Sequence, residues 1–250
     1  MAIGQARARD MPAVRALADR YGLTGEWPRR PDWIDHLLDR GGLWVDLLDG
    51  RAAGFAGVLR DGGATTHLTD LFVDPDALGR GTGKALLAAA FPPGGPRTTF
   101  ASGDPRALPL YTRAGLRPLA PLLYLAGAMA GAAAERIPVE AVPAGRPASL
   151  AFLAASGAYG LRAGEGSGVV RPVPGGAMLG PAVADAADLV ALAGAVAAAH
   201  GRVKLAIPGP HPALQPLLEA GLRVADADTY MATEPGLDDL ERRIPHPDLG

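Results

Sequence analysis

A weak internal repeat with an offset of 106 residues limits the folds that this chain of 250 residues can adopt. Without any gap, Pro75 aligns with Pro181, and the sequence Ala-Gly-Leu-Arg occurs at both 114–117 and 220–223. Chance identity is an alternative in a chain rich in Ala, Gly and Leu. The order strand, helix, strand, helix recurs in both copies, however, and this agreement favours a true repeat. We therefore expect two related domains.

The expected domains are residues 1–127 and 128–250, joined near Gly127–Arg136. In the first, the pattern of apolar, Gly and Pro residues predicts the order β-α-α-β-β-β-α-β-α-β, a mixed sheet with helices on both faces. Asp10 is predicted as a helix N-cap, and turns are predicted at Asp49–Arg51 and Asp61–Gly63. The expected elements of the first domain are a strand at 3–9, a helix from 10 to 21, a helix from 31 to 41, strands at 43–48, 53–59 and 68–73, a helix at 84–91, a strand at 98–101, a helix at 104–114 and a strand at 122–125. The second domain is expected to contain a strand at 177–181, a helix at 185–200, a strand at 202–207 and a helix at 212–220.

The composition excludes several classes of protein. With 48% hydrophobic and 20% charged residues the chain is globular, and its net charge of −2 gives no footprint for nucleic acid. It contains no cysteine, and its five histidines lack the spacing of a helical zinc site, so we expect neither thiolate chemistry nor a bound metal. No apolar stretch is long enough to span a bilayer, and residues 1–10 lack a secretory signal, which favours a cytoplasmic protein.

A glycine-rich turn, Gly79–Lys84, follows an apolar strand and begins an apolar helix. The unpaired amides of a helix N-terminus and its dipole attract phosphate, and glycines let the backbone approach the ligand closely. A nicotinamide site is a poor fit, because the pattern is G-x-G-x-G and lies behind several strands. A P-loop also fails, because Ala85 stands where Ser or Thr is required. A turn without a ligand is the remaining alternative.

Two motifs together resemble the GNAT superfamily of acyl-CoA-dependent N-acetyltransferases, and the resemblance covers residues 1–127. Residues 71–87 are similar to its CoA-binding motif, and residues 104–116 to its later helix. The resemblance implies an α/β (mixed α+β) fold with two GNAT-like domains, each a largely antiparallel sheet flanked by helices. Leu78 stands where the family often has Arg or Gln. We therefore expect phosphate binding to be weakened but not lost, because most contacts there come from backbone amides.

The resemblance also implies how acetyl-CoA binds. The backbone at the end of the strand would pair with the pantetheine arm, and the glycine turn would hold the pyrophosphate. The implied donor-binding residues are Leu71, Phe72, Val73, Gly79, Arg80, Gly81, Thr82, Gly83 and Lys84.

For catalysis, Tyr111 matches the family tyrosine that protonates the departing thiolate, and a backbone amide near Val73 would stabilise the oxyanion. Asp70 lies at a strand position where some members carry a base, often acting through water. Packing of Tyr111 between helix and sheet, and ion pairing of Asp70, are the structural alternatives. His67 is a weaker alternative base and is expected to be an exposed strand residue. Trp27 and Trp33 are expected to pack at the core and rim of an acceptor pocket.

The second copy lacks each residue assigned to chemistry. Under the offset of 106 residues, Gly81 becomes Ala187 and Tyr111 becomes Leu217, whereas the apolar and helix-ending positions persist. We therefore predict a degenerate GNAT-like domain at residues 128–250 that binds no CoA.

The leading interpretation is an acetyl-CoA-dependent N-acetyltransferase that acts on a small amine by direct attack on the thioester. The alternative is a non-catalytic acyl-CoA sensor, which would need the glycines but neither Tyr111 nor Asp70. A structural domain without any ligand is a third possibility, against which the intact glycine turn argues. We expect no nucleic-acid or membrane partner, and the sequence does not specify an oligomeric state.

Overall fold

The computed structural model describes residues 3–27, 29–60, 65–91 and 94–250. The turn predicted at Asp61–Gly63 lies outside these ranges. In the first half (residues 1–127) the elements are β1 Ile3–Gln5, η1 Ala8–Asp10, α1 Met11–Arg20, η2 Leu23–Glu26, α2 Trp33–Asp39, β2 Leu43–Leu48, β3 Arg51–Leu59, β4 Thr66–Val73, η3 Pro75–Ala77, α3 Thr82–Ala90, β5 Arg97–Ala101, α4 Ala107–Arg113 and β6 Arg117–Gly127. In the second half (residues 128–250) they are β7 Glu135–Ile137, η4 Val139–Ala141, α5 Pro147–Ala155, β8 Tyr159–Ala163, β9 Gly166–Val173, β10 Gly176–Val183, α6 Ala186–His200, β11 Val203–Pro208, α7 Leu214–Glu219, β12 Arg223–Ala232 and β13 Arg243–Ile244.

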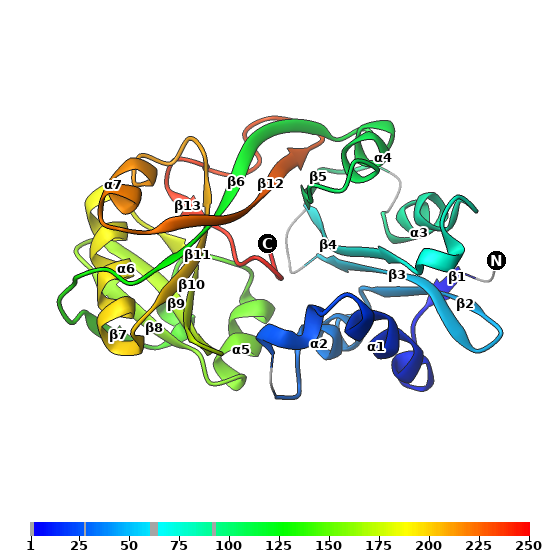
Figure 1. Cartoon of the computed structure of the whole chain (residues 1–250), viewed down its shortest axis with the longest axis horizontal. Coiled ribbons are helices and arrows are strands. Elements are labelled where there is room, and N and C mark those ends of the chain that lie inside the picture. Colours follow the sequence, from blue (N-terminus) through cyan, green and yellow to red (C-terminus); the bar gives the residue numbers. More distant parts are fainter. Residues whose placement is uncertain (1–2, 28, 61–64, 92–93) are drawn as a thin grey trace.

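All the described strands belong to one mixed, mostly antiparallel sheet that runs through both halves (Figure 1). Its order is β1-β2-β3-β4-β5-β12-β6-β11-β10-β9-β8-β7, with β13 paired to β10. Strand β12, from the second half, lies between β5 and β6. Strand β6, from the first half, pairs in turn with β11. The two halves therefore exchange their last long strands, which the sequence did not lead us to expect.

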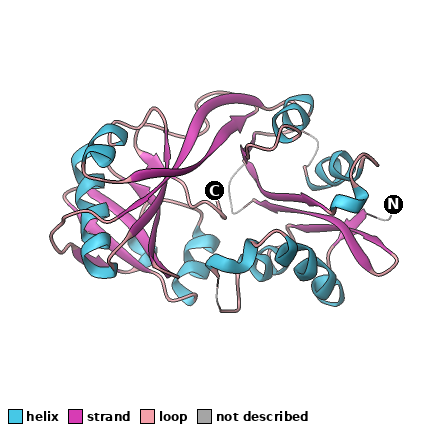
Figure 2. Cartoon of the chain, viewed as in Figure 1, coloured by secondary structure: helices cyan, strands magenta, loops and turns pink. Residues whose placement is uncertain are grey.

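Helices cover both faces of the sheet (Figure 2). On β3 the side chains alternate in direction, so Phe55 joins the core under α1 and α2, whereas the neighbouring Ala56 joins the core under α3 and α4. A separate core lies under α6 and α7. The core under α1 and α2 also contains Phe152 and Leu249 from the second half. The two halves are thus joined by packing as well as by strand exchange.

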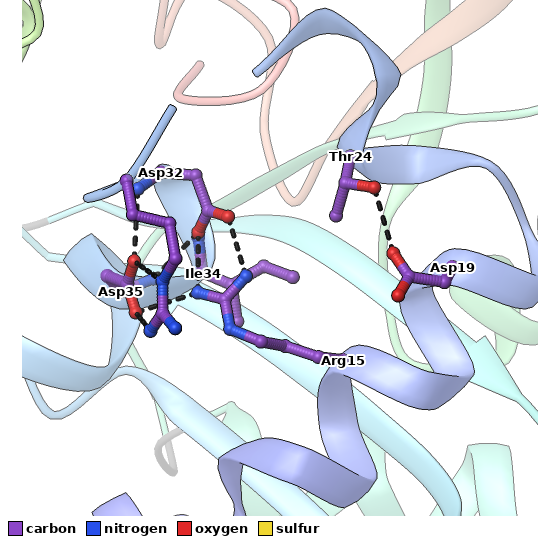
Figure 3. A network of polar contacts seen from close by, with 7 residues as sticks. Arg15, Asp19, Thr24, Asp32, Ile34 and Asp35 are labelled. Atoms are coloured by element: carbon purple, nitrogen blue, oxygen red, sulfur yellow. Dashed lines mark hydrogen bonds and ion pairs between the residues drawn. The ribbon is translucent and has the colours of Figure 1, made fainter. Parts of the chain in front are cut away.

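The start of α2 is held by a polar network (Figure 3). The Asp32 carboxylate accepts hydrogen bonds from the Ile34 and Asp35 amides at 3.1 and 3.2 Å, as an N-cap does. The same carboxylate accepts from the Arg15 guanidinium of α1 at 2.6 and 3.0 Å. Arg15 also contacts Asp35 at 2.7 Å. One buried carboxylate therefore caps α2 and ties it to α1.

Asp10 occupies the predicted N-cap position of α1 but its side chain makes no cap hydrogen bond, and the strand predicted at 3–9 is too long. The chain leaves β1 after Gln5 and forms η1, so that Asp10 is itself in a helical conformation. Its carboxylate accepts the Arg7 amide at 2.9 Å and closes this turn instead of capping α1. Helix α1 still begins at Met11, close to the predicted position.

Strand β6 is longer than the predicted 122–125. Pro118 and Pro121 lie within it, although proline cannot donate to a ladder. Both lie where β6 has β12 on one side only, since the ladder with β11 begins at Leu122. A proline is tolerated at such an edge.

The repeat is visible in the structure. Under the offset of 106 residues, β5, α4 and β6 align with β11, α7 and β12 to within about a residue at each start. None of the helices in the described ranges has the length and apolarity to cross a bilayer.

Candidate acyl-donor cleft

Strands β4 and β5 separate in the middle of the sheet. They pair in parallel only from Thr66↔Arg97 to Leu68↔Thr99, and beyond this point β4 continues to Val73 without β5 beside it. The Asp74 amide donates to the Ala53 carbonyl of β3 at 2.9 Å. Because backbone groups alternate in direction along an antiparallel strand, those of Leu71 and Val73 face the open edge.

A glycine turn and the N-terminus of α3 follow β4. Gly79 and Gly81 have φ of 76° and 82°, a left-handed conformation that other residues adopt at a cost. Gly81 occupies the N-cap of α3, and no side chain caps it. The first amides of α3 are therefore available to a ligand, as the sequence predicted for an anion site.

The open edge of β4, the glycine turn and α4 enclose a cleft of about 350 Å³. The predicted site residues that line it are Leu71, Phe72, Val73, Gly79, Gly81, Thr82, Gly83 and Tyr111. Arg80 and Lys84 are exposed and lie outside the lining, and so does Asp70. The lining also includes Tyr21, Ser102 and Arg106, which the sequence analysis did not single out. Arg106 lies within the predicted helix motif and could have been found there, whereas Tyr21, at the end of α1, carries no local signal.

Tyr111 projects from α4 into the cleft and is 7% exposed. Burial raises the pKa of its phenol, and the charge of Asp70 raises it further. The phenol is therefore protonated at neutral pH and can donate a proton.

Asp70 lies on the opposite face of β4, towards α2. Its Oδ2 accepts hydrogen bonds from the Trp33 indole at 3.2 Å and from the Thr69 hydroxyl at 2.6 Å. Burial raises the pKa of this carboxyl from 3.8 to about 7, and the charge of Asp248 acts in the same direction. A bulge at Thr69 interrupts the pairing of β4 with β3 at this point. Asp70 and Tyr111 thus flank the place where the strands separate.

The expectation that His67 is an exposed residue is wrong. It is 1% exposed, because the second half covers it, and Gly250 packs against its ring. Its Nδ1 lies 2.9 Å from the Thr98 hydroxyl. Burial, with the nearby charge of Arg146, keeps its pKa well below 6.5. His67 also lines a cavity of about 240 Å³ between the two halves.

The two tryptophans pack as predicted, at 6% and 2% exposure for Trp27 and Trp33. Their rings lie 6.1 Å apart, and the Trp27 ring also lies 5.4 Å from Phe152 of the second half. The Trp27 indole donates to Asp248 at 2.8 Å. Within the described ranges there is no group of three or more His, Asp or Glu side chains placed to hold a metal ion.

The second half contains a counterpart of the open edge, and the chain itself fills it. Strand β10 pairs with β11 at Ala177↔Val203, and β4 pairs with β5 at Thr66↔Arg97. Val203 is the equivalent of Arg97 under the offset of 106, so Ala177 is the equivalent of Thr66. The offset within this strand is therefore 111, and the predicted gap-free alignment of Pro75 with Pro181 is wrong. With this offset, the bulge of β4 at Thr69 corresponds to residue 180, which lies within the irregular part of β10 between Leu179 and Ala182.

With this alignment, residues 182–184 are the equivalents of Leu71–Val73. They pair with the C-terminal segment, through Ala182↔Ile244 in β13 and through the Ala184 amide, which donates to the Arg242 carbonyl at 3.0 Å. An extended chain therefore lies against this edge in the second half. In the first half the same edge borders the cleft.

Comparisons with known proteins agree with this geometry. The profile of the acetyltransferase (GNAT) family matches residues 11–116. A Pyrococcus horikoshii protein assigned as an acetyltransferase has a similar structure, with 14% identity, a TM-score of 0.79, and coverage of 100% of this chain and 95% of that one. A tandem GNAT protein from the clavulanic acid biosynthesis pathway has 18% identity, a TM-score of 0.61, and coverage of 95% and 99%. A GCN5-related N-acetyltransferase from Sphaerobacter thermophilus has 16% identity, a TM-score of 0.57, and coverage of 95% and 97%. No curated protein matches the chain. Residues 11–116 therefore match a domain of the acetyltransferase (GNAT) family, and the chain has the fold of GNAT acetyltransferases over its length.

Proposed function

We propose that the chain transfers the acetyl group of acetyl-CoA to the amine of a small acceptor, by direct attack on the thioester. One observation carries this proposal: a single cleft brings together the open edge of β4, the uncapped N-terminus of α3 and the protonated phenol of Tyr111. A ligand that carries amides, a pyrophosphate and a thioester matches these three features in that order.

In the proposed complex, the amides of the glycine turn and of α3 hold the pyrophosphate, and Leu71 and Val73 pair with the pantetheine arm. The residues that contribute to donor binding are Leu71, Phe72, Val73, Gly79, Arg80, Gly81, Thr82, Gly83 and Lys84. Arg80 and Lys84 contribute long-range positive charge, because neither side chain lines the cleft.

The acceptor nitrogen forms a bond to the thioester carbon as the carbon–sulfur bond breaks. Asp70, whose pKa near 7 suits a base at neutral pH, takes the amine proton directly or through water. A backbone amide near Val73 stabilises the oxyanion. Tyr111 gives its phenolic proton to the departing thiolate and regains one from solvent. Because Asp70 faces α2, the acceptor approaches from that side of the sheet.

We also propose that residues 1–127 form the catalytic domain and that residues 128–250 form a degenerate one that binds no CoA. In the second half the N-cap of α6 is Asp185 where α3 has Gly81, and Leu217 stands in place of Tyr111. The C-terminal segment of this half pairs with the edge at which a donor would bind.

The test is an amine panel assayed for release of free thiol from acetyl-CoA. An acetyltransferase gives thiol in proportion to acetylated product with at least one small amine. An acyl-CoA sensor binds acetyl-CoA but gives no product with any amine, and this outcome would refute the proposed activity.

A further inference from the structure

Tyr21, the C-cap residue of α1, packs against the end of β4 beside the donor cleft. Its hydroxyl donates a hydrogen bond to the Val73 carbonyl at 2.7 Å. Its ring leans on Phe72, with the ring centres 5.1 Å apart. The side chain is 40% exposed and lines the cleft. Tyr21 is thus an element of the cleft that comes from far outside the glycine turn and the α4 motif.

The bond to Val73 involves one of the few backbone groups that an extended ligand can use. Because the groups of Phe72 and Asp74 face β3, only those of Leu71 and Val73 face the open edge. In the second half the residue equivalent to Val73 is Ala184, whose backbone bonds the C-terminal segment beside it. At the corresponding position of the first half, the Val73 carbonyl instead accepts a hydrogen bond from the phenol of Tyr21.

We propose that the Tyr21 hydroxyl competes with the pantetheine arm for the Val73 carbonyl, so that acyl-donor binding displaces it. The proposal rests on the proposed function, because it assumes that the cleft binds a CoA thioester.

The surroundings of Tyr21 allow this displacement. The end of α1 is fixed beside β4, because the Arg20 guanidinium contacts the Asp74 carboxylate at 2.6 Å. The backbone of Tyr21 can therefore stay in place while its exposed side chain rotates. The competing bond is a neutral one at a partly exposed site, so its loss should change donor affinity by about three- to tenfold.

The experiment compares Tyr21→Phe with the parent chain by calorimetry, using three ligands. They are CoA, pantetheine, which is the arm alone, and adenosine 3′,5′-bisphosphate, which lacks the arm. The phenylalanine keeps the ring on Phe72 and removes only the hydroxyl. Tyr159→Phe is the matched control, because it removes a phenol that bonds His200 at 2.7 Å in the second half. A thermal melt of each variant confirms folding.

The expected result is that Tyr21→Phe binds CoA and pantetheine about three- to tenfold more tightly, with unchanged affinity for the bisphosphate. Tyr159→Phe should change none of the three. Unchanged or weaker binding of pantetheine would overturn the proposal, and so would an equal gain for all three ligands. If the parent binds none of the three, the proposed function itself fails, which is a distinct result.

Discussion

The buried carboxyl of Asp70 should destabilise the fold at neutral pH, and its replacement by Asn should reveal by how much. In the folded chain its pKa is about 7, against 3.8 for the exposed group. A difference of about three pKa units corresponds to about 4 kcal/mol, at 1.36 kcal/mol per unit. Between these two pKa values the folded state holds a proton that the unfolded state has lost. The parent therefore loses stability as pH rises through this window, and the full penalty is present above it.

Asn carries no charge at any pH, and its side-chain oxygen can still accept the Trp33 indole. We therefore expect Asp70→Asn to be more stable than the parent by up to about 4 kcal/mol near pH 8, and by less than about 1 kcal/mol near pH 4. Urea unfolding followed by tryptophan fluorescence measures this difference. Asp39→Asn, at the exposed end of α2, is the control and should show no such dependence.

Two results would refute the reasoning. One is a variant that is less stable than the parent near pH 8. The other is a stability difference that stays constant from pH 4 to pH 8. Either would mean that Asp70 is ionised in the folded chain at little cost, and a carboxylate of that kind would be a poor base at neutral pH.

Two further variants test the acid and the scaffold. Tyr111→Phe should lower kcat more than tenfold in the thiol-release assay while calorimetry shows little change in acetyl-CoA affinity, because only the proton donor is lost; equal rates would remove Tyr111 from the mechanism. Asp32→Ala should lower the free energy of unfolding in urea by about 2–4 kcal/mol, because it removes the cap of α2 and one partner of Arg15. Thr24→Ala, which removes an exposed bond to Asp19, should cost less than about 1 kcal/mol; similar losses in both variants would contradict the assigned role of Asp32.

Local sequence signals predicted the local structure well. Strand β2 has the predicted bounds, because the hairpin turn that ends it needs two left-handed residues, and Asp49 and Gly50 adopt φ of 51° and 77°. The glycine turn before α3 was found for the same reason, since Gly81 needs a conformation that few other residues tolerate.

The exchange of β6 and β12 could not be predicted from the sequence. Alternation along a strand shows which side chains face a core, but it does not show which strand lies alongside. The same limit explains the error at His67, which alternates like an exposed residue. The second half buries it, and Gly250, distant in the sequence, packs on its ring.

The candidate site was only partly visible in the sequence. Asp70 and Tyr111 were selected as single positions, and their placement on opposite faces of β4 depends on the bulge at Thr69. Tyr21 carries no motif, because its role comes from where α1 ends in space. Residues 242–244 cover the edge of β10 that corresponds to the open edge of β4, and this pairing depends on how the C-terminal segment folds back.

The most direct test of the account is a calorimetric titration of the chain with acetyl-CoA, beside two matched variants. Gly81→Glu places a carboxylate at the N-cap of α3, and Ala187→Glu adds the same charge at an exposed position in the first turn of α6. The account predicts one acetyl-CoA per chain, lost in Gly81→Glu and kept in Ala187→Glu. At 100 times its Kd, the ligand should also stabilise the fold by about 2.7 kcal/mol. Two sites per chain, or no binding by the parent, would contradict it.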